Sequence, residues 1–173
     1  MHEDLFSQAE TLAKLDVKKP KQVNLRRAVS SAYYAVFHYL VHEACCVQIG
    51  TQHAQAPYRH ALGRAFAHSI MKEACTSFGG GTLKDAVIKG LRDTSGNYPI
   101  LKQIQDIAST FAELQEKRHL ADYNRSERFK RSDVLALVEE AKNHVTKFSE
   151  LAVSDQKKYF LACLWAWKEL TRR

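Results

Sequence analysis

Apolar side chains recur at steps of three and four residues along most of this chain, as one face of an α-helix requires. No stretch shows the strict alternation that a half-buried β-strand would give. Proline, glycine and polar breaks predict helices over residues 3–16, 22–48, 57–78, 82–93 (short), 99–121, 132–152 and 154–171, with a turn at 94–99. The pattern predicts an all-α fold, an antiparallel bundle of about five to six helices in a single domain, 1–173.

Two serines mark the expected starts of the last two helices. Ser132 is expected to be an N-cap, with Asp133 favourable at the positive end of the helix dipole. Ser154 is expected to cap the final helix, which carries Trp165 and Trp167 and is apolar nearly all round. Such a helix belongs in the core or in a contact between subunits.

The helix over 99–121 has an apolar seam that ends on an arginine. The seam runs through Ile100, Ile104, Ile107, Phe111 and Leu114, and its next positions are Arg118 and Ala121. A guanidinium at a buried position needs a carboxylate, helix-end carbonyls or water, and Asp122 stands one turn later. Arg118 is therefore either a structural residue that complements the helix terminus or the phosphate-binding residue of a cleft.

Basic residues gather just after this seam, and the chain as a whole has a net charge of +7. Such an excess favours an anionic partner, most often nucleic acid. The basic residues around the seam's end are Lys117, Arg125, Arg128, Lys130 and Arg131, interleaved with Tyr123 and Phe129. Aromatic rings among cations can stack on unpaired bases. The alternative is that these residues form a charged loop that is simply solvated.

The helix over 22–48 carries a polar seam at the same rhythm. Its members are Arg27, Ser31, Tyr34, His38, Val41 and Cys45. Such a seam either lines a cleft or forms a structural ladder of hydrogen bonds. His38, His42 and Cys46 have metal-ligand spacing, but residue 39 is a tyrosine and no second ligand cluster accompanies them. We therefore expect no metal and no cofactor.

Four cysteines without a Cys-x-x-Cys pair suit reduced thiols, and the first ten residues lack the features of a signal peptide. The most apolar run, residues 159–167, is too short to span a bilayer. These features predict a cytoplasmic protein that does not enter a membrane.

Two motifs resemble the prokaryotic HEPN superfamily. "RRAVSSAYYAVFH" at 26–38 is similar to the second helix of that family, and "RHLADYN" at 118–124 is similar to its R-x-x-A-D-Y element. The resemblance covers about residues 3–152 and leaves the helix at 154–171 as an addition.

The resemblance implies a homodimer that binds RNA or a nucleotide in a basic cleft, in a toxin–antitoxin or other defence system. It also implies a metal-independent endoribonuclease, in which the arginine holds the phosphate and a histidine moves the proton. This chain has Tyr123 where that histidine is usual, which leaves His119 or His38 for the role. The expected catalytic set is Arg118, His119 and Tyr123. The expected RNA- or nucleotide-binding set is Arg27, Tyr34, His38, Lys117, Asp122, Arg125 and Arg128.

The alternative is a helical protein-interaction module without catalysis, for example a partner of a nucleotidyltransferase. Such a module would expose an apolar patch, for which the last helix is the first candidate. RNA binding would instead need the basic residues at 117–131 to be exposed.

Overall fold

The computed structural model describes residues 1–81, 83–91 and 100–172, and within them the protein is helical, without strands. The predicted all-α bundle is confirmed. The helices are α1 (His2–Lys14), α2 (Gln22–Ile49), α3 (Ala56–Gly63), α4 (His68–Gly79), α5 (Asp85–Leu91), α6 (Lys102–Tyr123), α7 (Arg131–Glu150) and α8 (Asp155–Thr171), with a 3-10 turn at His53–Gln55. The turn predicted at 94–99 and the predicted helix start at Pro99 lie outside the described residues.

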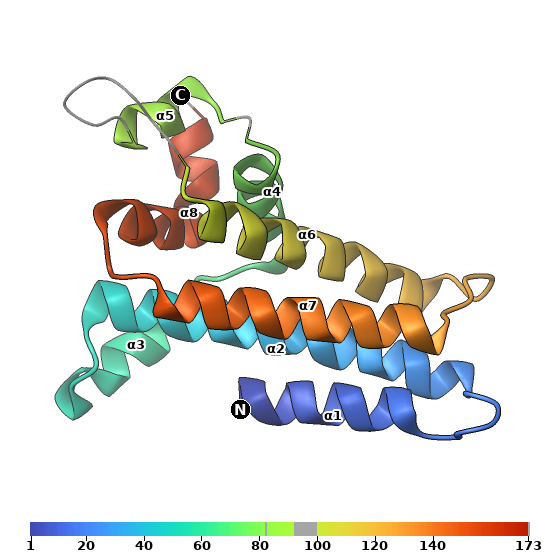
Figure 1. Ribbon diagram of the computed structural model, residues 1–173. Helices are drawn as coiled ribbons and strands as arrows, with labels where there is room; N and C mark the ends of the chain where they lie inside the picture. Colours follow the sequence, from blue (N-terminus) through green and yellow to red (C-terminus); the bar gives the residue numbers. More distant parts are fainter. Residues whose placement is uncertain (82, 92–99, 173) are drawn as a thin grey trace.

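Three long helices, α2, α6 and α7, form the body of the molecule (Figure 1). α1 packs against α2 and α7 along one side, and α3 packs against the far end of α2. α4 packs against α6 and α8, and α5 packs against α8, so these short elements gather at one end of the long helices.

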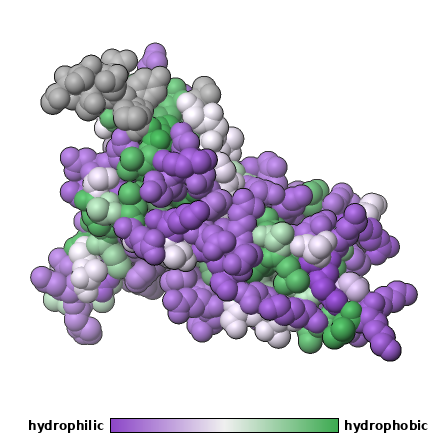
Figure 2. All heavy atoms as spheres, in the orientation of Figure 1, coloured by the Kyte–Doolittle hydropathy of each residue, from purple (hydrophilic) through white to green (hydrophobic). Residues whose placement is uncertain are grey.

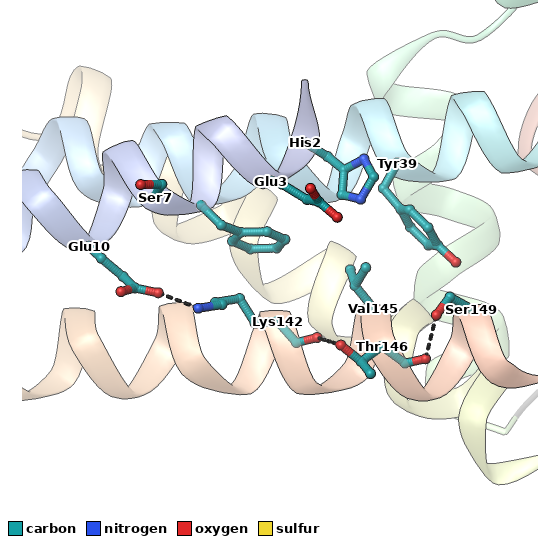
Figure 3. A pocket seen from close by; sticks show the side chains of 10 residues that line it. His2, Glu3, Ser7, Glu10, Tyr39, Lys142, Val145, Thr146 and Ser149 are labelled. Atoms are coloured by element: carbon teal, nitrogen blue, oxygen red, sulfur yellow. Dashed lines mark hydrogen bonds and ion pairs between the residues drawn. The ribbon is translucent and has the colours of Figure 1, made fainter.

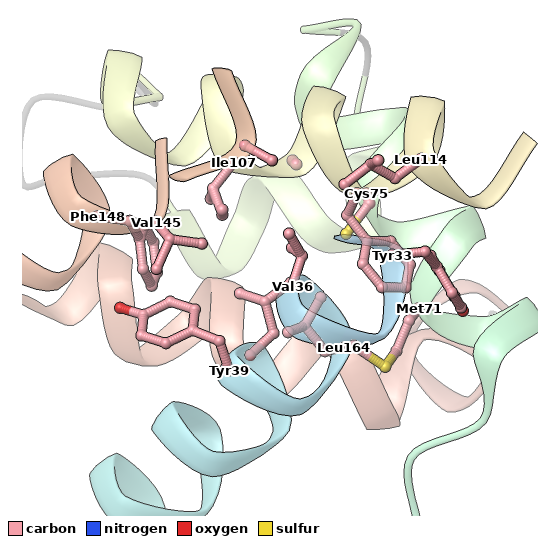
Figure 4. Packing of buried hydrophobic residues seen from close by; sticks show 14 of the residues in the cluster. Tyr33, Val36, Tyr39, Met71, Cys75, Ile107, Leu114, Val145, Phe148 and Leu164 are labelled. Atoms are coloured by element: carbon pink, nitrogen blue, oxygen red, sulfur yellow. The ribbon is translucent and has the colours of Figure 1, made fainter. Parts of the chain in front are cut away.

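The core lies where α2, α4, α6, α7 and α8 meet (Figure 4). Tyr33, Phe111, Phe148 and Phe160 are among its largest members, and each is 1 % exposed or less. The apolar seam predicted on α6 is confirmed, because its residues from 104 to 114 are buried. Burial of rings of this size is the main source of stability in such a bundle.

The single helix predicted over 57–78 is wrong, because the chain breaks into α3 and α4. Ala67 has an extended backbone (φ −111°, ψ 134°) that ends the helical path, and Phe66 turns into the core. α3 buries no residue, whereas α4 buries its apolar face against α6. At the end of α4, a Cβ on Gly79 would lie 2.9 Å from the backbone nitrogen of Ser109, so glycine permits the close approach of the two helices.

One of the two predicted N-caps is confirmed. The Ser154 side chain accepts a hydrogen bond from the Lys157 backbone N–H, as a cap should. The prediction for Ser132 is wrong: α7 begins one residue earlier with Lys130 as its extended N-cap. The Ser132 hydroxyl instead donates to Asp133 Oδ1 at 2.8 Å.

Lys157 fixes α8 onto the bundle from a position that is 1 % exposed. Its Nζ donates to the carbonyls of Phe148 (3.1 Å) and Leu151 (2.9 Å) at the end of α7, and it pairs with Glu43 Oε1 at 2.8 Å. The buried charge is thus fully satisfied, and it stabilises the negative end of the α7 dipole.

The face shown in Figure 2 is mostly hydrophilic, and hydrophobic residues appear on it in separate small areas. α8 buries Trp167 but leaves Trp165 38 % exposed. Within the described part of the chain, no helix combines the length and the apolar character that crossing a bilayer requires.

Candidate functional site

Arg118 meets Asp122, the carboxylate among the partners that the sequence left open for it. Its Nε lies 2.7 Å from Asp122 Oδ2, and the two side chains are 27 % and 25 % exposed. The N–H at Nε is not aligned as a hydrogen bond, so charge holds the pair. Ser30 on α2 donates to the other oxygen, Oδ1, at 3.0 Å. The carboxylate is therefore positioned by both α2 and α6.

Most donors of the Arg118 guanidinium remain available. Among the described residues, its one hydrogen bond runs from Nη2 to the Tyr34 hydroxyl at 3.4 Å, a long contact. Burial opposes the charge, but the nearby Asp122 raises the pKa of Arg118 above its ordinary value. A fork of donors that is charged, partly buried and largely unused is suited to a phosphate.

Three tyrosine rings surround this guanidinium. Its Cζ lies 6.0 Å from the ring centre of Tyr33, 5.8 Å from that of Tyr34 and 5.8 Å from that of Tyr123. Tyr33 is buried in the core, whereas Tyr123 ends α6 and is 66 % exposed. The rings attract the cation through their faces and help to hold it in place. The exposed ring of Tyr123 is also free to stack on a base.

His68, which the sequence did not single out, joins the same cluster. It is the first residue of α4, and its Nδ1 lies 2.5 Å from the Tyr33 hydroxyl. Its ring stacks on Phe37 at 4.2 Å and meets Tyr34 edge-on at 6.2 Å. Burial, and then the positive charge of Arg118, lower the pKa of His68 below 6.5. At neutral pH this imidazole is uncharged and able to accept a proton.

The two histidines that the sequence predicted for the site, His38 and His119, lie at the edges of the cluster. His38 stacks on Tyr34 with 6.2 Å between ring centres, and burial lowers its pKa. His119 projects to the outside, where its ring lies 4.9 Å from that of Tyr123. Arg27 is exposed at the start of the polar seam of α2, which lines a hollow against α1.

The basic residues predicted to act together are divided by the structure. Lys117 and Arg128 line a separate pocket of about 170 Å³, together with Glu113 and Glu127. Carboxylates thus offset the cations on that face. Arg125 is exposed in the loop between α6 and α7.

Two other arginines from the basic stretches have structural roles that the sequence did not reveal. The Arg26 guanidinium donates to the carbonyls of Leu120, Ala121, Asn124, Arg125 and Glu127, at distances from 2.6 to 3.4 Å. Arg131 donates in the same way to the carbonyls of Ala13, Leu15, Asp16 and Val17, at the end of α1. Each completes the C-terminus of a helix.

The predicted metal-ligand spacing does not form a ligand cluster. His42 Nε2 lies 3.5 Å from Cys46 Sγ, while His38 turns toward Tyr34. Within the described ranges, no three His, Cys, Asp or Glu side chains are grouped so that they could hold a metal ion.

A cavity of about 560 Å³ lies between α1, α2 and α7 (Figure 3). Glu3 and Glu10 line it, and Lys142, its cation, pairs with Glu10. Its described lining residues include no arginine, so it is a poorer match for an anion than the Arg118 cluster.

We compared the chain with models of known protein families, with curated proteins and with solved structures, and none of them matches it.

Proposed function

We propose that this protein is a HEPN-type RNA-binding protein of a prokaryotic toxin–antitoxin or other defence system, and that Arg118 is its phosphate-binding residue. The observation that carries the proposal is the largely unused guanidinium, enclosed by three tyrosines at the end of an apolar seam. The resemblance of residues 26–38 and 118–124 to the HEPN motifs supports it further.

Arg118 contacts the phosphate in this proposal, while Tyr123 stacks on a neighbouring base. Asp122 and Tyr34 orient the guanidinium. The direct test is incubation of labelled mixed-sequence RNA with the protein, with and without EDTA. We expect binding in both conditions and cleavage that the chelator does not change. An absence of RNA binding at low salt, where phosphate contacts are strongest, would refute the function.

Cleavage at this site requires a proton acceptor, and we assign that role to His68. When its Nδ1–H donates to the Tyr33 hydroxyl, Nε2 has a free lone pair. It takes the proton from a ribose 2′-hydroxyl, whose oxygen then attacks the phosphorus. The P–O5′ bond breaks, the 5′ oxygen takes a proton from water, and the products are a 2′,3′-cyclic phosphate and a 5′-hydroxyl. The Arg118 charge stabilises the additional negative charge on the phosphate oxygens.

Replacing His68 by alanine should lower the cleavage rate by about 100-fold, the contribution typical of a positioned base, while RNA affinity changes by less than about twofold. Because burial and Arg118 lower the pKa of His68, wild-type cleavage should fall on acidification with a midpoint at a lower pH than an ordinary histidine would give. Both quantities are measured in single-turnover assays over a pH series. The control is His53→Ala, an exposed histidine of the 3-10 turn. Equal cleavage by the two variants would remove His68 from the mechanism.

A homodimer is expected, because two copies of the cluster would place two arginines along one RNA backbone. Light scattering at micromolar concentration should give twice the chain mass of 19.7 kDa. A protein that stays monomeric while binding RNA would show that one cluster is sufficient.

The alternative, a protein-interaction module that partners a nucleotidyltransferase, has less support. It calls for an apolar patch on the last helix, and Trp165 is the one large hydrophobic side chain that α8 exposes among its described residues.

A further inference from the structure

Two adjoining hollows follow the polar seam of α2 beside the Arg118 cluster. The first lies against α1, has a volume of about 430 Å³ and is lined by Arg27, Tyr34 and His38 among others. The second lies against α3, has a volume of about 400 Å³ and includes His38 again, now with His60 and Arg64. In Figure 1, α1 and α3 lie one after the other along the same side of α2. His38 lines both hollows, and together they form the α2 groove.

The lining of the α2 groove is basic. Neither hollow has an aspartate or a glutamate among its described lining residues. Arg27 and Arg64 are exposed, and no acceptor from the described part of the chain holds either guanidinium. Arg59, by contrast, donates to the carbonyls of Gly50 and Gln52 and is structural. One free arginine lines each hollow, Arg27 the first and Arg64 the second, and each can contact a phosphate of a bound strand.

Aromatic rings also line the groove. Tyr34 and His38 stack on each other in the middle of the groove, and Tyr34 also accepts the hydrogen bond from Arg118. Tyr34 therefore connects the Arg118 cluster to the groove. From Arg27 to His42 the helix rises by about 23 Å, at about 1.5 Å per residue. At about 3.4 Å per stacked nucleotide, this length corresponds to roughly six or seven nucleotides.

We infer that the α2 groove binds a single-stranded RNA segment that lies along Arg27, Tyr34, His38 and Arg64 and includes the phosphate held at Arg118. This inference rests on the proposed function and adds the class of substrate: a strand with unpaired bases, several nucleotides longer than the cleavage site. Stacking on Tyr34 and His38 requires exposed base faces, which a duplex keeps inside its own stack.

The inference is tested by fluorescence anisotropy with labelled single-stranded RNAs of about four, eight and twelve nucleotides. Wild-type affinity should rise from the shortest to the middle length and then level off. Arg64→Glu should weaken binding of the longest strand by about tenfold, with little effect on the shortest. It should also reduce the slope of log affinity against log salt concentration by about one, the share of a single phosphate contact. The control is Lys168→Glu, the same charge reversal at an exposed position of α8, which should change affinity by less than about twofold.

Four results would overturn the inference. In the first, Arg64→Glu has the same RNA affinity as Lys168→Glu, while Arg118→Ala still binds RNA more weakly than the wild type. The groove would then have no role in binding, and the proposed function would remain. A duplex of the same sequence could compete as well as the single strand, which would exclude unpaired bases as the feature recognised. Polyglutamate could compete equally, which would identify the groove as a site for acidic protein segments. If the wild-type protein binds no RNA at all, the proposed function and the groove both fail.

Discussion

Replacement of Arg118 by alanine should lower the affinity for single-stranded RNA by about 100-fold or more, and any cleavage with it. A loss of about 2.7 kcal/mol is what removal of a charged, forked phosphate contact entails. The fold should persist, because the ion pair with Asp122 is partly exposed and Ser30 still holds that carboxylate. Anisotropy gives the affinity, and urea unfolding should give a free energy within about 1 kcal/mol of wild type.

Two further variants sharpen this test. Arg118→Lys keeps the charge but loses the planar fork, so it should recover part of the affinity and leave a deficit of about tenfold. Lys168→Ala removes a distant exposed charge and should behave as wild type. If Arg118→Ala unfolds at much lower urea than wild type, Arg118 is a structural residue and the proposed site is wrong.

The neighbouring pair Arg26 and Arg27 should separate stability from binding. Arg26→Ala should lower the free energy of unfolding by about 3 kcal/mol, because it removes charged donors from several carbonyls at the end of α6. In the variant, water can replace the arginine only at those carbonyls that are exposed. Arg27→Ala should change stability by less than about 0.5 kcal/mol, since its side chain is exposed, yet it should weaken RNA binding. Urea unfolding and anisotropy on both variants provide the measurement; equal stabilities would contradict the capping role of Arg26.

Local periodicity predicted the parts of the site that lie on one helix. The seam of α6 and the i, i+4 pairing of Arg118 with Asp122 both depend on helical geometry alone, so the residues are sufficient to show them. The same is true of the serine cap at 154, where the side chain satisfies a neighbouring backbone group.

Contacts between distant segments were not predictable in this way. The break between α3 and α4 has no proline to mark it and comes from Phe66 turning into the core. Because the sequence pattern of 57–78 predicts one continuous helix, it gave no indication that His68 lies beside Tyr33. In the same way, the sequence shows Arg26 and Arg131 as two more positive charges. Only the packing of α6 and α1 next to these arginines shows that the two guanidinium groups donate hydrogen bonds to backbone carbonyls.

Lys157 and the rings of α8 also bear on the order in which the protein folds. Phe160 packs on Phe78 and Phe148, at 5.0 and 5.8 Å between ring centres, so α4 and α7 both lack part of their cover until α8 arrives. During synthesis, residues 155–171 leave the ribosome after the other described helices. Phe78 and Phe148 therefore gain this contact only after those helices have emerged, and α4, which carries His68 of the Arg118 cluster, packs against α8 only then.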